Sequence, residues 1–336
     1  MTIKLAINGF GRIGRLVLRA LHEQNRDDLQ VVAINDLGSV AANAQLLKYD
    51  SVHGRFKGEI ATGENWMDIG RGKIKVLAER DPAKLPWKDL AVDVALECTG
   101  LFTKRETAAK HLDAGAQRVI VSAPADGVDI TIVIGVNSDQ VNASHRVLSN
   151  GSCTTNCLAP VAYVLNENVG IVHGFMTTIH SYTGDQRTVD TLHHDMRRAR
   201  AAAINMIPTS TGAAKALGLV IPALNGKLDG CAIRVPTPNV SLIDFKFSAA
   251  RDTGKDEINA LMEKAAKSNR FRGILAAIKD EVVSSDFNHD PHSSSFDLTQ
   301  TAVIDKRFCR VLSWYDNEWG FSNRMVEAAA LVGKLG

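Results

Sequence analysis

The chain has 336 residues, 45% of them hydrophobic and 23% charged, and its 39 basic and 37 acidic residues leave a formal net charge of +2. At roughly 150 residues per domain, this length predicts about two domains, each able to bury its own core. The composition excludes collagen-like, intrinsically disordered and small disulfide-dependent chains. The near-neutral charge provides no polybasic stripe, so we do not expect nucleic acid as a partner.

The apolar runs are too short for a membrane protein. None approaches the ~20 residues of a spanning helix, and Asn8 and Arg12 interrupt the first of them, so we expect neither a membrane anchor nor a secretion signal. The five cysteines are odd in number and lie mostly in apolar runs, which argues against a disulfide framework. We therefore expect a cytoplasmic protein.

The first 151 residues alternate short β-branched runs with helical patterns. Strands are expected at residues 3–7, 31–35, 92–97, 119–122 and 130–136, and helices at 12–23 and 106–114. This alternation predicts a Rossmann-type α/β domain with a parallel sheet.

Longer, alternating segments follow in residues 152–316. The clearest strands are expected at 170–180, 230–247 and 301–316, which predicts an α+β catalytic domain with a mostly antiparallel sheet. The polar stretch 181–205 reads as a long ordered loop, and such loops are usually functional or interfacial. The end of the chain, 317–336, contains an alanine-rich helix from residue 322 and is expected to join the first domain.

Gly9, Gly11 and Gly14 form a G-x-G-x-x-G sequence between the first strand and the first helix. Glycine permits the tight turn, the backbone approach to a pyrophosphate and close helix–strand packing. Asp36 ends the second strand about 20 residues further on, where a carboxylate can accept both ribose hydroxyls. The same charge disfavours a 2′-phosphate, so the sequence predicts NAD in preference to NADP.

Cys153 is the best nucleophile candidate, since a cysteine in the first turn of a helix lies at the positive end of its dipole. Ser152 or Thr154 can cap that helix. Pro160 requires either a kink or a later start of the regular helix. Cys157 lies one turn further in, and the cysteines at 98, 231 and 309 are expected to be structural.

A thiolate needs a base, and His180 ends an expected strand just before the polar loop, where it could serve. The pairs His193–His194 and His289–His292 lack partners in a recognisable zinc pattern, so we expect no metal.

Two anion sites are candidates in the second half of the chain. Residues 209–214 precede an expected helix that contains residues 215–217, and they offer hydroxyl and N–H groups. Arg234 lies in an apolar run and should meet an anion, either a structural carboxylate or a substrate phosphate. At least two of the three arginines at positions 197, 198 and 200 are expected in a solvated or intersubunit loop.

The sequence resembles phosphorylating glyceraldehyde-3-phosphate dehydrogenases over essentially its whole length. The matching segments are residues 7–14, 48–54, 152–157, 180–186, 208–213, 234–238 and 314–320. Two positions depart from the family pattern. Gly151 stands where alanine is usual, which we expect to loosen the chain beside Cys153. The loop at residues 190–193 reads Asp-Thr-Leu-His where strongly NAD-selective members commonly carry a Leu-Pro pair, which weakens the expected exclusion of NADP.

The resemblance implies specific roles for individual residues. Cys153 would be the nucleophile and His180 its base. Residues implied to hold the substrate and inorganic phosphate are Ser152, Thr154, Thr183, Arg198, Thr211, Gly212 and Arg234. Residues implied to contact NAD, with the three glycines, are Arg12, Ile13, Asp36, Arg80, Ser122 and Asn317. The family is typically a cytoplasmic homotetramer.

The implied reaction is the oxidative phosphorylation of glyceraldehyde 3-phosphate to 1,3-bisphosphoglycerate through a thiohemiacetal and a thioester. Three alternatives remain at this point: an erythrose-4-phosphate dehydrogenase, which would hydrolyse the thioester; a semialdehyde dehydrogenase; and a catalytically silent NAD-binding interaction protein.

Overall fold

A computed structural model describes residues 2–335, which form two compact units. The first unit comprises residues up to Ile132, Gln140–Gly151 and the segment from Ser322 onward. The second comprises Val133–Asp139 and Ser152–Phe321. This division differs from the expected domain limits at residues 133–139 and 317–321, which belong to the second unit.

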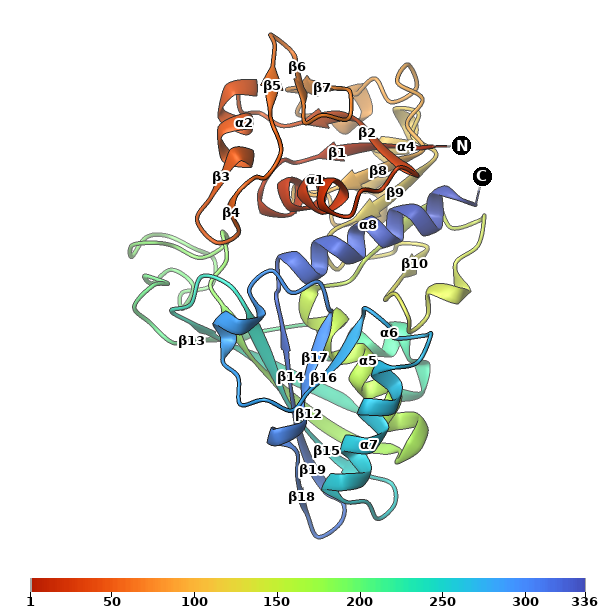
Figure 1. The fold of residues 1–336 in the computed structure, drawn as a ribbon, viewed down its shortest axis with the longest axis vertical. Coiled ribbons are helices and arrows are strands. Elements are labelled where there is room, and N and C mark those ends of the chain that lie inside the picture. The colour runs from red at the N-terminus through yellow and green to blue at the C-terminus, as the bar shows by residue number, and fades with distance from the viewer. Residues whose placement is uncertain (1, 336) are drawn as a thin grey trace. The chain divides into compact units, whose positions relative to one another are not determined.

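The first unit is built on a nine-stranded sheet with the order β10-β11-β9-β8-β1-β2-β7-β6-β5 (Figure 1). Its strands are β1 (Ile3–Asn8), β2 (Leu29–Asn35), β5 (Ala61–Thr62), β6 (Trp66–Asp68), β7 (Lys73–Leu77), β8 (Val94–Glu97), β9 (Arg118–Val121), β10 (Ile130–Thr131) and β11 (Val147–Ser149). All pairs from β10 to β7 are parallel, whereas β5 and β6 form an antiparallel edge. Every residue of β8 and β9 is buried, as expected when helices cover both faces of a parallel sheet.

The helices of this unit are α1 (Arg12–Glu23), α2 (Val40–Lys48), α3 (Arg105–Ala108), α4 (Lys110–Asp113) and most of α8 (Trp319–Gly333). A small hairpin of β3 (Tyr49–Asp50) and β4 (Gly54–Arg55), and the 3-10 turns Pro82–Lys84 and Ser138–Gln140, complete the regular structure up to α5. The helix expected over residues 106–114 is divided at Ala109 into α3 and α4.

The second unit contains a mostly antiparallel sheet with the order β13-β14-β12-β15-β19-β17-β16. Its strands are β12 (Ile171–Ser181), β13 (Ile207–Ser210), β14 (Leu228–Val235), β15 (Ser241–Ala249), β16 (Leu275–Ile278), β17 (Ser294–Asp297), β18 (Ala302–Ile304) and β19 (Phe308–Tyr315). Its helices are α5 (Cys153–Asn168), α6 (Leu217–Val220) and α7 (Lys255–Ala266), with 3-10 turns at Pro222–Leu224, Ser284–Phe287 and Leu298–Gln300.

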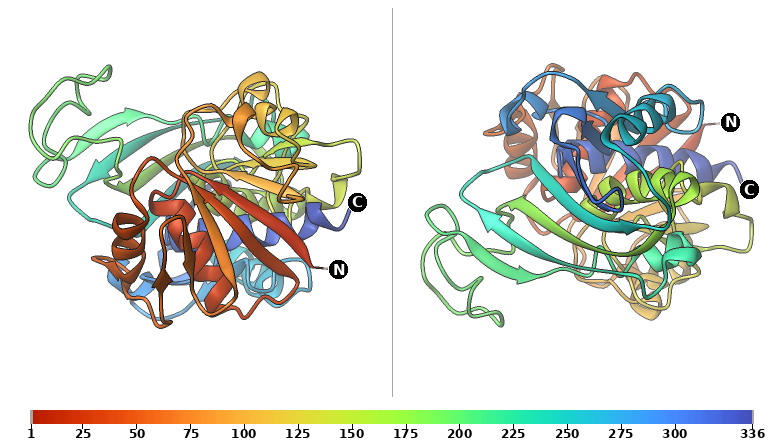
Figure 2. Two further views of the ribbon diagram at one scale, coloured as in Figure 1. Left: turned by 90° about the horizontal axis from the view of Figure 1, so that it is seen from above. Right: turned by 90° about the horizontal axis from the view of Figure 1, so that it is seen from below.

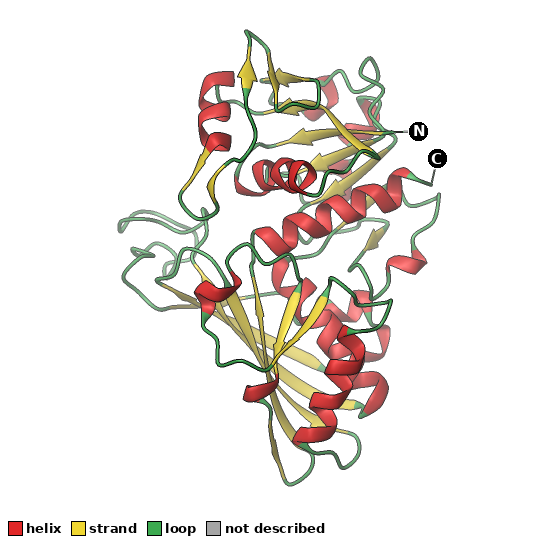
Figure 3. Ribbon diagram, viewed as in Figure 1, coloured by secondary structure: helices red, strands yellow, loops and turns green. Residues whose placement is uncertain are grey.

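One face of this sheet is covered by helices. Helices α5 and α7 pack together and against the sheet (Figure 3). Burial alternates along β15, and Phe245 and Phe247 point into the core shared with α5. The right view of Figure 2, seen from below, shows the curved strands of this sheet in front. The expected fold class, a Rossmann-type domain plus an α+β domain, is confirmed.

Two expected strands prove to be pairs. The run 230–247 contains β14 and β15, separated where Pro236 and Pro238 lack the N–H that a sheet ladder requires. The run 301–316 is the hairpin of β18 and β19, which turns at Asp305 and Lys306 with positive φ angles of 47° and 60°. Hydrophobic patterning marked both segments as extended but not the reversals within them.

Three further expectations were tested by the structure. The first-unit strand expected over 130–136 stops at Thr131, and the helix expected around Lys215 begins only at Leu217. Residues 182–206 lie between β12 and β13 without helix or strand, as expected. Among residues 2–335, no helix has the length and apolar character needed to cross a membrane.

Candidate active site

Cys153 is the first residue of α5. The Ser152 hydroxyl caps this helix and accepts the Thr155 N–H at 3.0 Å, so Ser152 is the cap. The helix is assigned from Cys153 through Pro160 to Asn168, so a later start is excluded. Gly151 precedes the cap with φ of +63°, a conformation that favours glycine over alanine. Cys153 therefore lies at the positive end of the helix dipole.

His180 lies near the end of β12 and faces this sulfur. Its Nε2 is 3.6 Å from Sγ of Cys153, and its Nδ1 is 2.7 Å from the carbonyl oxygen of Ser181. A carbonyl only accepts, so we assign the proton of the neutral ring to Nδ1, where it is donated to the Ser181 carbonyl. In the neutral ring Nε2 then carries the lone pair, in position to take the thiol proton.

Arg234 lies in β14, which runs parallel to β12. In this pairing Arg234 is the direct cross-strand partner of His180. Its Nη1 donates to the Ser181 carbonyl at 2.9 Å and lies 2.8 Å from Nδ1 of His180. Both nitrogens are donors in the tautomer assigned above, so they share the carbonyl as acceptor. The Ser181 carbonyl thus orients the imidazole and the guanidinium together.

The charged states of this group depend on burial and on the arginines. Burial raises the pKa of the Cys153 thiol, and the charge of Arg234 partly opposes that rise. Burial, followed by the charge of Arg234, lowers the pKa of His180 to about 3. The resting pair is therefore a neutral thiol beside a neutral imidazole. An anion bound to Arg234 would weaken its effect on His180 and make protonation of the ring easier.

Tyr315 is a member of this cluster that sequence reasoning did not assign. Its hydroxyl lies 2.8 Å from Oγ1 of Thr154 and 2.9 Å from Oγ1 of Thr178. Its ring packs edge-on against the ring of His180, with 6.0 Å between the two ring centroids. Tyr315 is buried, and burial raises its pKa well above the usual value. Because Thr154 is held there by its hydroxyl, the first turn of α5 is tied to β12 and β19. Burial along β19 does not alternate strictly, and the sequence FCRVLSWY carries no clear signal for an inward Tyr315.

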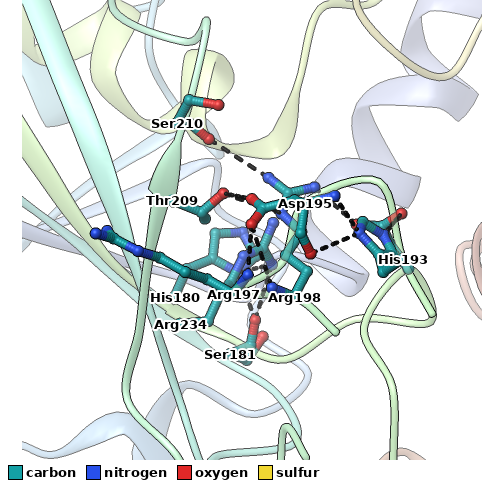
Figure 4. A network of polar contacts seen from close by, with 10 residues as sticks. His180, Ser181, His193, Asp195, Arg197, Arg198, Thr209, Ser210 and Arg234 are labelled. Atoms are coloured by element: carbon teal, nitrogen blue, oxygen red, sulfur yellow. Dashed lines mark hydrogen bonds and ion pairs between the residues drawn. The ribbon is translucent and has the colours of Figure 1, made fainter. Parts of the chain in front are cut away.

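Arg198 lies in the loop after β12 and is held by a polar network (Figure 4). Its guanidinium donates to Asp185 at 2.7 Å and to Oγ1 of Thr209 at 3.0 Å. Asp195 accepts the Thr209 hydroxyl at 2.8 Å and the backbone N–H of Arg198 at 3.3 Å. His193 reinforces the network, since its Nδ1 accepts the Asp195 N–H at 2.9 Å. Burial is the main cause of the lowered pKa values of His180 and Arg234, and the positive charge of Arg198 lowers both further, whereas the charge of Asp185 raises the pKa of Arg234.

The other expected anion-binding residues occupy neighbouring loops. Thr183 follows β12 in a turn closed by the Gln186 N–H on its carbonyl, and the Thr211 hydroxyl accepts the Ala213 N–H at 3.2 Å. A Cβ on Gly212 would meet no protein atom within 4 Å, so space is open beside it. Arg200 instead pairs with exposed Asp190 at 2.5 Å.

Asn317, expected to contact the cofactor, lies in the second unit beside Ser181. Its Oδ1 accepts the hydroxyls of Ser181 and Ser241, both at 2.9 Å. The side chain is nearly buried, and the two hydrogen bonds fix the orientation of its amide. Asn317 therefore contacts the residue that follows His180 in β12.

The glycine-rich turn of the first unit has the shape of a phosphate cradle. A Cβ on Gly9, whose φ is +91°, would lie 2.6 Å from the Thr99 nitrogen, and a Cβ on Gly14 would lie 2.1 Å from the Gly9 carbonyl oxygen. Gly11 caps α1 without a side chain, and a Cβ there would meet no protein atom within 4 Å. Glycine is thus required for packing at positions 9 and 14, whereas Gly11 leaves room in front of the N–H groups of Arg12 and Ile13. These features fit a bound pyrophosphate.

Asp36 follows β2 and lies against this turn. Its two carboxylate oxygens accept the N–H groups of Phe10 at 2.9 Å and Gly38 at 2.8 Å.

The other residues expected to contact the cofactor in this unit lie on nearby segments. Arg12 forms a two-pronged ion pair with Asp50. Burial raises the pKa of the Asp50 carboxyl, but Arg12 and neighbouring N–H groups lower it more strongly, so the net pKa is lowered. Exposed Arg80 lies beyond β7, and Ser122 follows β9 directly.

Three of the other cysteines have thiol pKa values raised by burial. Burial raises the pKa of Cys98 and Cys157 to about 12 and that of Cys309 to about 11. Cys98 and Cys231 are half-buried, and Cys157 contacts Ser294 inside the core. No cluster of three or more potential metal ligands occurs among the described residues.

The fold and the two sites define a two-unit dehydrogenase, with a Rossmann unit for a dinucleotide and a second unit that carries a thiol–imidazole pair. Family models agree: residues 3–105 match the NAD binding domain of glyceraldehyde 3-phosphate dehydrogenase, and residues 152–317 match its C-terminal domain. Similar proteins named glyceraldehyde-3-phosphate dehydrogenase include those of Xanthobacter flavus, 64% identical over 336 residues, and Cereibacter sphaeroides, 62% identical over 335 residues, each covering 100% of both chains. A third, from Pseudomonas aeruginosa, is 56% identical over 98% of both chains. The chain belongs to the glyceraldehyde 3-phosphate dehydrogenase family, and NAD is the cofactor of its first unit.

Proposed function

We propose that the chain oxidises D-glyceraldehyde 3-phosphate and joins the product to inorganic phosphate, forming 1,3-bisphosphoglycerate with NAD as cofactor. The observation that carries this proposal is the 3.6 Å contact between Sγ of Cys153 and Nε2 of His180, with Arg234 on the same histidine. Family membership supports the choice of substrate.

In the proposed first step, Sγ of Cys153 bonds to the aldehyde carbon. Nε2 of His180 takes the thiol proton and passes it to the former carbonyl oxygen, which gives a thiohemiacetal. NAD, when bound, would supply the hydride acceptor for the oxidation of this adduct. His180 removes the hydroxyl proton in the same step, and the product on Cys153 is a thioester.

In the second step, a phosphate oxygen attacks the thioester carbon and the carbon–sulfur bond breaks. The sulfur leaves as a thiolate and recovers its proton from Nε2 of His180. Two anions must bind, namely the phosphate of the substrate and the attacking phosphate. We assign them to Arg198, Arg234 and the nearby groups Ser152, Thr154, Thr183, Thr211 and Gly212. Positioning and charge stabilisation by such groups each contribute about a few kcal/mol.

For the cofactor, we assign the pyrophosphate to the turn containing Gly9, Gly11 and Gly14 and the N–H groups of Arg12 and Ile13. Asp36 would hold the adenosine ribose. Arg80 and Ser122 in the first unit and Asn317 in the second are further proposed contacts.

We also propose a cytoplasmic homotetramer. Exposed apolar side chains support association, and they occur on the loop after β12 and on the outer sheet face: Val189, Leu192, Met196, Ile204 and Met206, and Val172, Phe175 and Phe308. All five cysteines are free thiols, in keeping with a reducing compartment.

The deciding experiment measures NAD reduction with glyceraldehyde 3-phosphate, with and without inorganic phosphate, beside erythrose 4-phosphate. We expect phosphate-dependent turnover that strongly prefers the three-carbon aldehyde. Phosphate-independent turnover with erythrose 4-phosphate would overturn the substrate assignment but keep the roles of Cys153 and His180. Turnover with neither would overturn the catalytic proposal.

A further inference from the structure

A buried polar network crosses the first unit along the carboxyl edge of its parallel sheet. It contains the side chains of Trp87, His111, Glu97, Asn8 and Asn35, and we call it the Glu97 network. Trp87 and His111 are fully buried, Glu97 is 1% exposed and Asn8 is 2% exposed. Water therefore cannot replace a lost partner in its centre.

Two series of hydrogen bonds in this network end at the carboxylate of Glu97. From one end, Nε1 of Trp87 donates to Nδ1 of His111 at 2.9 Å, so the proton of that ring lies on Nε2, which is 3.0 Å from Oε2 of Glu97. The same oxygen accepts Nδ2 of Asn8 at 2.6 Å. The other oxygen, Oε1, accepts the N–H of Thr99 at 2.8 Å and its hydroxyl.

The opposite end is anchored to backbone and cannot reverse. The Asn35 amide donates to the Asn8 side-chain oxygen at 2.7 Å, and it exchanges two hydrogen bonds with the backbone of Glu79, both at 2.8 Å. The Glu79 N–H and C=O fix the orientation of Asn35, which fixes that of Asn8. The indole nitrogen of Trp87 can only donate, so it fixes His111 as a donor to Glu97, and Asn35 fixes Asn8 as a second donor. Thr99 donates to the other oxygen, so only a side chain with two acceptor oxygens fits at position 97.

The members of this network adjoin the residues assigned to the cofactor. Asn8 precedes Gly9, Asn35 precedes Asp36 and Glu79 precedes Arg80 along the chain. Thr99, bound to Glu97, is the residue whose nitrogen a Cβ on Gly9 would approach to 2.6 Å. The network therefore joins the ends of β1, β2 and β8, and the segment after β7, directly beneath the proposed NAD contacts.

We propose that Glu97 is a positioning residue for NAD, which sets the glycine-rich turn, Asp36 and Arg80 in register through this network. The inference rests on the proposed NAD site in the first unit. Substitution of the carboxylate by an amide would place a donor either against both His111 and Asn8 or against the N–H of Thr99. Asn8 and Thr99 both adjoin Gly9, so relaxation of either residue would shift the glycine-rich turn.

The test compares E97Q with D93N, both checked for folding by thermal unfolding. Asp93 precedes β8 at its other end and accepts the Lys4 N–H at 2.8 Å, so it ties the same two strands at the opposite edge. We expect E97Q to raise the Kd and KM for NAD by at least about tenfold, with kcat and the aldehyde KM within about twofold of wild type. D93N should leave all four values within about twofold.

Direct titration of NAD by calorimetry separates the possible failures. If the wild-type protein does not bind NAD, the proposed function fails; if it binds and E97Q binds equally well, the positioning role is wrong. An equal loss in D93N would reduce the effect to general sheet stability and would also overturn the inference.

A second pair of variants decides the matter if E97Q does not fold. In H111Q the amide can still donate to Glu97 and accept from Trp87, whereas H111L can do neither. We expect H111Q to bind NAD at least about fivefold more tightly than H111L. Equal NAD affinities in the two variants would contradict the proposal.

Discussion

His180 directs its unprotonated Nε2 at Sγ of Cys153 across 3.6 Å, while the protonated Nδ1 is fixed on the Ser181 carbonyl. Nε2 can therefore accept the thiol proton, because the only proton of the neutral ring lies on Nδ1, in the hydrogen bond to the Ser181 carbonyl. Reactivity at Cys153 is therefore coupled to the imidazole and, through the shared carbonyl, to Arg234.

Replacement of the nucleophile should separate catalysis from cofactor binding. We expect C153S to reduce kcat by at least about a thousandfold, since the hydroxyl is far less nucleophilic, and to leave the Kd for NAD within twofold. The matched control is C157S, because Cys157 lies one turn further along α5, in the core against Ser294. C157S should keep activity within about threefold. Initial rates, iodoacetate labelling and NAD titration test both variants, and retained turnover in C153S would remove Cys153 from its role.

The buried imidazole should also make stability depend on pH. The pKa of His180 is lowered from 6.5 to about 3, so below pH 6.5 the unfolded chain binds a proton that the folded protein does not. Folding stability is thus lost as pH falls, by about 1.4 kcal/mol per pH unit from this group. From pH 7 to pH 5, H180N should lose about 2 kcal/mol less unfolding free energy than wild type. Urea unfolding at pH 7, 6 and 5 measures this, and parallel curves would refute the buried neutral state.

Arg198 and Arg200 form a natural pair for testing the anion site. Arg198 is held by Asp185 and Thr209, whereas Arg200 pairs with Asp190 at the exposed surface. Lysine keeps the charge but loses the planar fork, so R198K should raise the KM for the phosphorylated aldehyde or inorganic phosphate about tenfold. R200K should change neither KM by more than about twofold. Separate titration of the two substrates shows which anion Arg198 contacts; equal behaviour of both variants would argue against its assignment.

Asp36 should control cofactor choice. D36A removes the acceptor for the N–H groups of Phe10 and Gly38 and the charge that repels a 2′-phosphate. We expect at least a tenfold rise in the NAD KM and at least a tenfold rise in NADP use relative to NAD. D27A serves as control, because the Asp27 side chain is 95% exposed ahead of β2 and should have no effect on either cofactor. An unchanged NADP-to-NAD ratio in D36A would place selectivity elsewhere.

Local sequence signals predicted the two segments that dominate the sites. The glycine spacing after a β-branched run specified the turn between β1 and α1, and Ser152 before Cys153 specified the start of α5. Both predictions succeed because turn and cap chemistry act over only a few residues. His180 was placed at a strand end for the same reason.

What the sequence could not provide was the meeting of distant residues. Tyr315 reaches Thr154 across 161 positions, and Glu97 reaches Asn8 across 89, and neither pair leaves a periodic signal. The break between β14 and β15 was also missed, although Pro236 and Pro238 mark it, because the apolar residues on both sides gave one continuous strand pattern. Such contacts arise from sheet order, which spacing along the chain does not determine.

The composition of the first unit from three separate stretches has a consequence for biosynthesis. Ile3 in β1 packs against Gly333 in α8, where a Cβ would lie 2.5 Å from the isoleucine side chain, and Gln24 contacts Asn323. Strand β1 is synthesised early, but its packing against α8 can form only after α8 has been synthesised. Nascent chains that have exposed only the first 151 residues should stay protease-sensitive and depend on chaperones, whereas the second unit, made mostly of one continuous stretch, can close before synthesis ends.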